Sequence, residues 1–271
     1  MLNTERRNEK TMNIDRMTTD EMLRVIQDEN MNAVLAIEPE LPRIREAIDR
    51  ISERMLLGGR LFYVGCGTSG RLGVLDASEC PPTFGVDKGL VVGIIAGTDI
   101  ALRNAVEGAE DDYNRGACDI SAYKLTERDS VVGISVAGGA KYVIGAIEAA
   151  KACGALTVGL TCNEGSVIDK IADVSIRPNT GAEVISGSTR MKAGSAHKMI
   201  LNMISTSVMV KLGHVYENLM INLKPSNEKL KKRMIGIVSD ICDVDYDEAL
   251  RLLEENGFVI RRAIESAGGK R

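Results

Sequence analysis

A glycine-rich turn at residues 65–71 is the first segment of this sequence that could do chemistry. It reads Gly-Cys-Gly-Thr-Ser-Gly-Arg, follows the apolar run 61–64 and precedes a helical pattern. A turn of this kind places free backbone N–H groups, together with the hydroxyls of Thr68 and Ser69, at the positive end of a helix. We therefore predict an anion site that contains Gly67, Thr68, Ser69, Gly70 and Arg71.

Two other interpretations of this turn stay open. A dinucleotide-binding turn has the pattern G-x-G-x-x-G, but Arg71 stands where the last glycine belongs, and no suitable acid ends the next apolar run at 90–96. A turn with a structural role alone is the other alternative. Phosphate or sugar-phosphate binding is favoured over both.

Two acidic segments could supply proton transfer. Glu79 precedes the double proline Pro81-Pro82 closely, and we expect the helix to break there. A carboxylate at such a break can point into a cleft, and it can equally well neutralise a cation or cap a turn. Farther on, residues 107–112 contain four acids, among them Glu110. Most such runs form solvated surfaces.

A second segment rich in hydroxyls and cations runs from Ser186 to Lys198. It leads into an apolar, Met-rich helical pattern over Thr189–Leu212. The segment predicts either a second anion-binding helix end or an ordinary capped helix with cations facing solvent. His197 is a candidate acid or base here, but a hydrogen-bonded structural histidine is the favoured interpretation.

Composition limits the class of protein that positions these side chains. With 271 residues, 44% of them hydrophobic, the chain can bury one substantial core and a small appendage. Its 34 Lys and Arg and 38 Asp and Glu are interspersed, which argues against a nucleic-acid partner. No apolar run reaches the roughly 20 residues of a membrane span, and the polar start is unlike a secretory signal, so we expect a cytoplasmic protein without membrane contact. Six cysteines without a CxxC pair and only two histidines predict reduced thiols and no metal centre.

Alternating apolar and helical patterns predict the fold. Five apolar runs, at 61–65, 90–96, 130–136, 155–162 and 173–176, alternate with helix-like stretches and indicate an α/β fold with a parallel sheet covered on both faces. Helical patterns precede them at 18–27 and 41–57, and two or three short helices follow. We divide the chain into N-terminal helices (1–58), a sheet domain (59–224) and a small helical bundle (225–271) similar to ubiquitin-associated domains.

Several strings of the sequence resemble the N-acetylmuramic acid 6-phosphate etherase family. They are residues 65–73, 76–85, 106–111, 186–194, 218–220 and 226–230, with Thr4, Glu5 and Asn8 near the start. The similarity covers nearly the whole chain in the same order. It implies the sugar isomerase (SIS) fold, a doubly wound sheet of about five parallel strands flanked by helices, which the more distant glucokinase regulatory protein shares.

The resemblance also implies an activity. The family cleaves the D-lactyl ether of N-acetylmuramic acid 6-phosphate with water and no cofactor, to N-acetylglucosamine 6-phosphate and D-lactate, in the recycling of cell-wall amino sugars. By matching motifs, Glu79 resembles the proton donor and Glu110 the second catalytic acid, which acts as the base. Ser188, Arg190 and Lys192 are expected to bind substrate. The apolar helical pattern over Thr189–Leu212 and the amphipathic N-terminal helices offer more apolar surface than one sheet needs, which predicts a homodimer. The resemblance implies that its interface borders the active site.

One turn departs from the family pattern. Where the family usually has Ser-Gly-Arg-Thr-Pro, residues 137–141 read Ala-Gly-Gly-Ala-Lys, so two hydroxyls and a guanidinium are absent. The N–H groups of Gly138 and Gly139 and the charge of Lys141 remain as candidates for anion binding. His197 also stands where the family more often has Gln. Two alternatives therefore stay open, a non-catalytic regulator that binds a sugar phosphate and a lyase or isomerase for a different acidic sugar.

Overall fold

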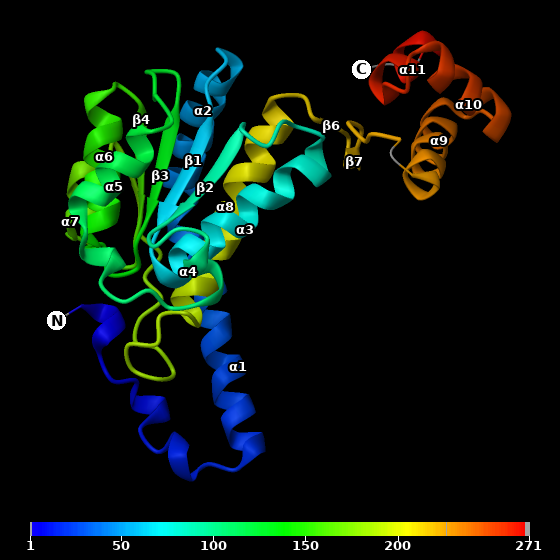
Figure 1. Ribbon diagram of the computed structural model, residues 1–271. Coiled ribbons are helices and arrows are strands. Elements are labelled where there is room, and N and C mark those ends of the chain that lie inside the picture. The colour runs from blue at the N-terminus through cyan, green and yellow to red at the C-terminus, as the bar shows by residue number, and fades with distance from the viewer. Residues whose placement is uncertain (1, 226, 269–271) are drawn as a thin grey trace. The chain divides into compact units, whose positions relative to one another are not determined.

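The computed structural model of the chain describes residues 2–225 and 227–268 (Figure 1). These residues form two compact units, one made of residues 2–78 and 89–208 and the other of residues 79–88 and 209–268. Ser226 and residues 269–271, which belong to the predicted C-terminal bundle, lie outside the described residues.

The first unit is built on a sheet of five parallel strands, as the sequence predicts. The strands are β1 (Leu61–Gly65), β2 (Val91–Ile95), β3 (Ser130–Ile134), β4 (Leu156–Leu160) and β5 (Val174–Ile176), in the order β2-β1-β3-β4-β5. Gly65 pairs with Ile95 on one side and Ile134 on the other, so three strands end at the same level. The chain leaves β1 toward β2 and later returns to the opposite side for β3. Ligands of open α/β sheets bind outside the carboxyl ends of the strands at such a switch point.

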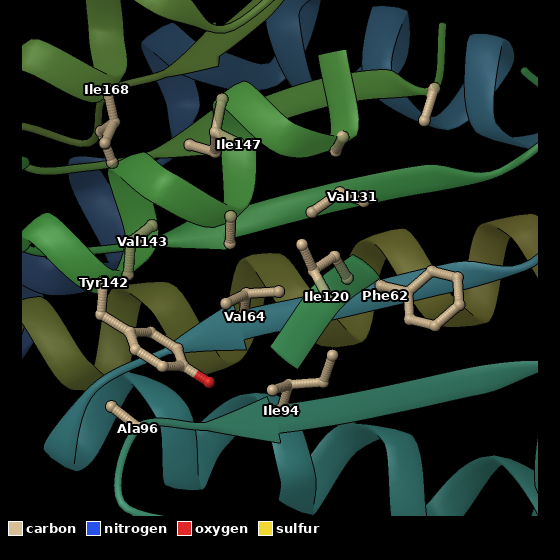
Figure 2. Packing of buried hydrophobic residues seen from close by; sticks show 13 residues of the cluster. Phe62, Val64, Ile94, Ala96, Ile120, Val131, Tyr142, Val143, Ile147 and Ile168 are labelled. Carbon is tan, nitrogen blue, oxygen red and sulfur yellow. The ribbon is translucent and has the colours of Figure 1, made fainter. Parts of the chain in front are cut away.

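Three helices cover one face of the sheet, namely α5 (Tyr113–Ser121), α6 (Lys141–Ala152) and α7 (Val167–Ile171) (Figure 1). Phe62, Val64 and Val131 point from the strands into this layer, where they meet Ile147 and Ile168 of the helices (Figure 2). Full burial of one such aliphatic or aromatic side chain contributes about 1.5–3 kcal/mol. This layer therefore anchors the strand ends that carry the site.

The opposite face is covered by α2 (Leu41–Leu56), α3 (Gly67–Phe84) and α8 (Lys192–Lys211). Polar contacts join α3 to α8, because Asp76 Oδ1 accepts hydrogen bonds from Asn202 Nδ2 at 2.6 Å and from Ser205 Oγ at 3.1 Å. The structure starts α8 three residues after the predicted Thr189. No helix in the described residues is both long enough and apolar enough to cross a membrane.

The N-terminal part consists of short 3-10 turns, at Asn3–Glu5, Glu9–Thr11, Ile14–Arg16 and Glu38–Glu40, and the helix α1 (Thr19–Leu35). Thr18 and Glu21 form a capping box at the start of α1, since each side chain bonds the backbone N–H of the other residue. Only Glu29 and Ala33 of α1 are buried. The helix is therefore held to the first unit by few of its own residues.

The double proline does not break its helix, contrary to expectation. Helix α3 continues through Pro81 and Pro82 to Phe84. A proline costs most in a helix interior, where it removes a hydrogen bond and collides with the carbonyl four residues earlier. The helix nevertheless closes its last turn after the prolines, where the Gly85 N–H donates to the Pro81 carbonyl at 2.9 Å. Glu79 consequently lies within a continuous helix rather than at a helix end.

The second unit contains a small helical bundle, as predicted. Its helices are α9 (Glu228–Cys242), α10 (Tyr246–Glu255) and α11 (Ile260–Ser266), and a two-stranded hairpin, β6 (Val215–Tyr216) with β7 (Leu219–Met220), precedes them. Met234, Val238, Leu253 and Ile260 are fully buried in its own core. The unit therefore has the apolar centre that an independent bundle needs.

Candidate active site

A cavity of about 210 Å³ lies at the switch point, outside the carboxyl ends of β1 and β3. We call it the switch-point cavity, and its walls are Cys66, Gly67, Thr68, Ser69, Glu110, Ile134, Ser135, Val136, Ala137, Ala140, Thr189 and Gly194. The walls combine a helix start, hydroxyl groups and one carboxylate. These are the groups that bind a phosphate and move a proton.

The predicted anion-binding turn forms the first wall of this cavity. Gly67 starts α3 with φ at +52°, a left-handed conformation that favours glycine. A helix start leaves the first N–H groups without acceptors inside the helix, so they are available to a ligand. Gly70 allows the turn to close on β1, because a Cβ there would lie 2.6 Å from the Gly65 carbonyl oxygen. Thr68 and Ser69 line the cavity as expected.

Glu110 faces the same cavity from the 3-10 turn Ala109–Asp111. The turn is entered through Gly108, whose φ is +73°. On one side of Glu110, Ala109 packs against the buried layer between the sheet and helices α5, α6 and α7. On the other side, Asp112 Oδ1 accepts a hydrogen bond from the Arg115 N–H at 2.9 Å and caps α5. The chain is anchored on both sides of Glu110, so the Glu110 backbone has a defined position beside the anion-binding turn.

The second predicted acid, Glu79, is not among the lining residues of this cavity. Its side chain is exposed on α3, and Glu79 is the first residue of the second unit. The catalytic role of Glu79 therefore stays a prediction.

Arg71 lies in a second cavity of about 260 Å³, which we call the side cavity. Its walls are Cys66, Gly67, Arg71, Ala96, Ala101, Asn104, Ala105, Val106, Glu107, Gly108, Ala109 and Glu110. The Arg71 guanidinium donates through Nε to the Leu102 carbonyl at 3.0 Å and through Nη2 to the Asn104 carbonyl at 3.3 Å. It therefore anchors the end of α4 (Ile100–Arg103) and the first residue of the segment that leads to Glu110.

Cys66 borders both cavities, but its thiol is a poor nucleophile. Burial, reinforced by the charges of Glu110 and Asp111, raises the pKa of Cys66 to about 12. The thiol is therefore protonated at neutral pH, whereas the thiolate is the reactive form.

In the described part of the chain, no group of three or more His, Cys, Asp or Glu side chains is arranged to hold a metal ion. Glu110 is the acid–base group that both cavities share.

The predicted glycines of the 137–141 turn occupy different environments. Gly138, with φ at +72°, donates its N–H within the chain, to the Ser135 carbonyl at 3.0 Å and the Ser135 hydroxyl at 3.1 Å. A Cβ on Gly138 would lie 2.1 Å from Ser166 Oγ, so only glycine fits there. Gly139 is exposed, and Lys141 Nζ lies 3.7 Å from Asp111 Oδ1 at the surface. Gly138 thus shapes the turn, and Gly139 and Lys141 face solvent.

The positive end of α8 is already occupied by a carboxylate of the chain. Glu183, which is fully buried, accepts the N–H of Lys192 through Oε2 and that of Ala193 through Oε1, both at 3.0 Å. Thr189 and Gly194 nevertheless line the switch-point cavity. Ser188 is half-buried and Arg190 exposed, and neither is among the lining residues.

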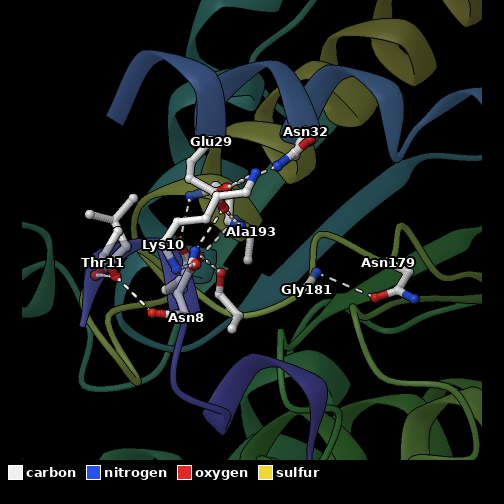
Figure 3. Close-up of polar contacts among 12 residues, drawn as sticks. Asn8, Lys10, Thr11, Glu29, Asn32, Asn179, Gly181 and Ala193 are labelled. Carbon is white, nitrogen blue, oxygen red and sulfur yellow. Dashed lines mark hydrogen bonds and ion pairs between the residues drawn. The ribbon is translucent and has the colours of Figure 1, made fainter. Parts of the chain in front are cut away.

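Lys192, a predicted substrate-binding residue, is only 2% exposed and pairs with Glu29 of α1. Glu29 also accepts hydrogen bonds from Asn8 at 2.9 Å, Lys10 at 3.1 Å and Asn32 at 3.1 Å (Figure 3). Burial alone would raise the pKa of Glu29, but the bonds from Lys192 and Lys10 outweigh it and lower the pKa. The contacts tie the N-terminal segment to the start of α8.

His197 is fully buried in α8, with Nε2 3.4 Å from Cys162 Sγ. Its Nδ1 has no hydrogen-bond partner among the described residues. Burial lowers the pKa of His197 to about 3, so the ring is neutral at physiological pH. The position fits a structural histidine better than an acid or base.

This burial predicts a pH dependence of stability. An unfolded His197 titrates near pH 6.5, so between about pH 6.5 and 3 the unfolded chain binds a proton that the folded chain does not, and stability decreases as the pH falls. Replacement His197→Gln should reduce the stability lost between pH 6 and 4 by about 2 kcal/mol. Denaturant unfolding at a series of pH values measures this difference. Parallel pH curves for the two proteins would contradict the prediction.

Comparison with known proteins identifies the family. A family model described as the glucokinase regulatory protein N-terminal SIS domain matches residues 43–151, and the SIS domain model matches residues 120–211. An N-acetylmuramic acid 6-phosphate etherase of Caldanaerobacter subterraneus subsp. tengcongensis is 58% identical over 96% of this chain and 85% of its own length. The chain belongs to the N-acetylmuramic acid 6-phosphate etherase family. The etherase of Clostridium beijerinckii is 51% identical over 97% of this chain and 86% of its own length.

The etherase family is one of carbon–oxygen lyases, so the prediction of an enzyme family is confirmed. A phosphoheptose isomerase from Francisella tularensis superposes with a TM-score of 0.55 at 17% identity, over 71% of this chain and 98% of the isomerase. At this identity the likeness shows the fold alone. The match to the SIS domain model and the observed five-stranded parallel sheet confirm the predicted SIS fold.

The departure from the etherase pattern lies on the cavity wall, because both Ala137 and Ala140 line the switch-point cavity. Ala140 is also the N-cap residue of α6 and makes no side-chain cap bond. The double replacement Ala137→Ser with Ala140→Thr should lower KM for a phosphorylated sugar about tenfold through recovered hydrogen bonds. The threonine should add roughly 1 kcal/mol of stability as a helix cap. Steady-state kinetics and thermal unfolding measure the two effects; an unchanged KM with a gain in stability would assign residue 140 to capping alone.

Proposed function

We propose that this chain cleaves the D-lactyl ether of N-acetylmuramic acid 6-phosphate, giving N-acetylglucosamine 6-phosphate and D-lactate. The observation that carries the proposal is that Glu110 shares the switch-point cavity with the N-terminus of α3, in a chain of the etherase family. Gly67, Thr68 and Ser69 would hold the phosphate there, since a helix start with free N–H groups favours an anion. Glu110 would then lie beside the sugar.

The proposed reaction is an elimination followed by a hydration. In the open-chain sugar the C2 proton is acidic because C2 is next to the aldehyde. The Glu110 carboxylate takes this proton, the electron pair forms a C2=C3 double bond, and the C3–O bond breaks. Glu79, as the general acid, gives a proton to the leaving oxygen, which releases D-lactate.

Water then completes the reaction. Its oxygen bonds to C3 while one of its protons goes to the Glu79 carboxylate, and Glu110 returns its proton to C2. Both acids end in their starting forms, and the sum consumes one water and no cofactor. Acid–base help of this kind contributes about 100- to 10,000-fold in rate.

Purified protein incubated with N-acetylmuramic acid 6-phosphate tests this function. D-lactate should be released in step with N-acetylglucosamine 6-phosphate. In water labelled with heavy oxygen, the label should appear at C3 of the sugar. Label in lactate would mean attack on the lactyl carbon, and no lactate at all would overturn the proposed activity.

Two other candidates are suggested by the two alanines in the cavity wall, which replace hydroxyls that the resemblance leads us to expect. A regulator that binds a sugar phosphate without turnover, or an enzyme for another acidic sugar, would need a different wall at this point. Binding of N-acetylglucosamine 6-phosphate without lactate release from the muramic sugar would favour the regulator over the etherase.

We also propose a homodimer, because α1 presents apolar side chains to solvent. Leu23 is 60%, Met31 50% and Leu35 64% exposed. A second copy of the chain would cover this surface. Sedimentation at micromolar concentration should show a dimer, and a stable monomer would contradict it. Action in the cytoplasm, in the recycling of cell-wall amino sugars, stays a prediction.

A further inference from the structure

Two cavities meet at Glu110. The switch-point cavity and the side cavity share three wall residues, Cys66, Gly67 and Glu110. A ligand with two arms could place one arm in each cavity, and the atoms that join the arms would then pass Glu110. The proposed substrate has this form, because C3 to C6 of the sugar join the lactyl ether oxygen to the phosphate, and C2, which carries the acidic proton, is bonded directly to C3.

The walls of the side cavity suit a small group with a methyl and a carboxylate. Its apolar lining consists of small side chains, namely Ala96, Ala101, Ala105, Val106 and Ala109. Arg71 is the cation among its lining residues, and the two contacts of its guanidinium use part of a fork of five N–H donors. This fork matches a carboxylate in two-point geometry. Glu107, the other acid of the wall besides Glu110, is exposed.

We propose that the side cavity is the subsite for the D-lactyl group, with Arg71 binding its carboxylate and the alanine walls receiving its methyl group. The proposal rests on the proposed function and adds a position for the leaving group. It moves Arg71 from the phosphate, where the motif alone would put it, to the other end of the substrate. The C2 proton and the C3–O bond then both lie next to Glu110.

Two sugars that differ only in the lactyl group test the subsite. The background is Glu110→Gln, so that equilibrium binding can be measured by calorimetry without turnover. Adding Arg71→Met should weaken binding of N-acetylmuramic acid 6-phosphate about 10- to 100-fold and that of N-acetylglucosamine 6-phosphate less than about twofold. Arg103→Met is the matched control. Arg103 is an exposed cation at the end of α4 that is not among the lining residues of either cavity, so both sugars should bind as before.

A second pair of measurements separates binding from a structural effect of Arg71 on the 102–104 backbone. Ala105→Phe fills the side cavity without changing Arg71, and it should cause the same selective loss. A substrate analogue in which the lactyl carboxylate is an amide should bind the Glu110→Gln protein about 10- to 100-fold more weakly than the acid does. Adding Arg71→Met should largely abolish this difference between acid and amide.

Equal losses of affinity for both sugars would overturn the subsite, and so would an unchanged preference for the acid over the amide in Arg71→Met. In either case, lactate release by wild type would still support the proposed function. If the Glu110→Gln protein does not bind the muramic sugar and wild type releases no lactate, both the subsite and the proposed function would be overturned.

Discussion

Glu110→Gln is expected to lower the rate of D-lactate release about 100- to 10,000-fold while the protein stays folded. The amide has nearly the shape of the carboxylate but cannot accept the C2 proton. Glu110 is exposed and lines the cavity from an anchored turn, so the replacement should change the free energy of unfolding by less than about 0.5 kcal/mol. The loss should therefore appear in kcat rather than in stability.

Matched replacements make this result specific. Glu79→Gln should cause a loss of similar size, because it removes the proposed proton donor. Glu127→Gln is the control, since Glu127 is an exposed acid before the amino end of β3, away from the carboxyl ends of the strands. Circular dichroism and unfolding curves should coincide for all three variants and wild type. Near-normal lactate release from Glu110→Gln or Glu79→Gln would remove that residue from the mechanism.

The sheet and its first turn could be predicted because both depend on local patterns. Each buried strand is a short apolar run, as in the fully buried β1, and parallel strands require helical crossovers between them. The glycine turn after β1 has the same local character, because Gly67 and Gly70 are needed for backbone reasons that the residue type itself reveals.

The second anion site could not be judged from sequence, because the partner of a charged group is not local. Lys192 looks available to a ligand in a segment rich in hydroxyls, yet its ammonium pairs with Glu29, 163 positions away. Glu183 caps α8 from nine residues before it, and nothing in the sequence marks it as a cap. The same limit applies to Arg71, whose carbonyl partners follow 31 and 33 residues later.

Lys192→Met is expected to lower the free energy of unfolding by about 3–5 kcal/mol, because it leaves the Glu29 carboxylate buried without its ammonium partner. Lys10, whose side chain is 62% exposed, cannot replace a buried cation fully. The effect is a desolvation cost and not the loss of a surface ion pair, which would be worth at most about 1 kcal/mol. Denaturant unfolding measures it directly.

Two further variants show whether the pair or the lysine itself is responsible. Lys198→Met, which removes an exposed cation from the same helix, should cost less than about 0.5 kcal/mol. Glu29→Gln combined with Lys192→Met should cost less than the sum of the single replacements, because no charge is then left buried alone. If Lys192 instead binds the substrate, Lys192→Met would raise KM and leave the unfolding curve unchanged. That result would return Lys192 to the site and reduce the contact with Glu29 to a minor one.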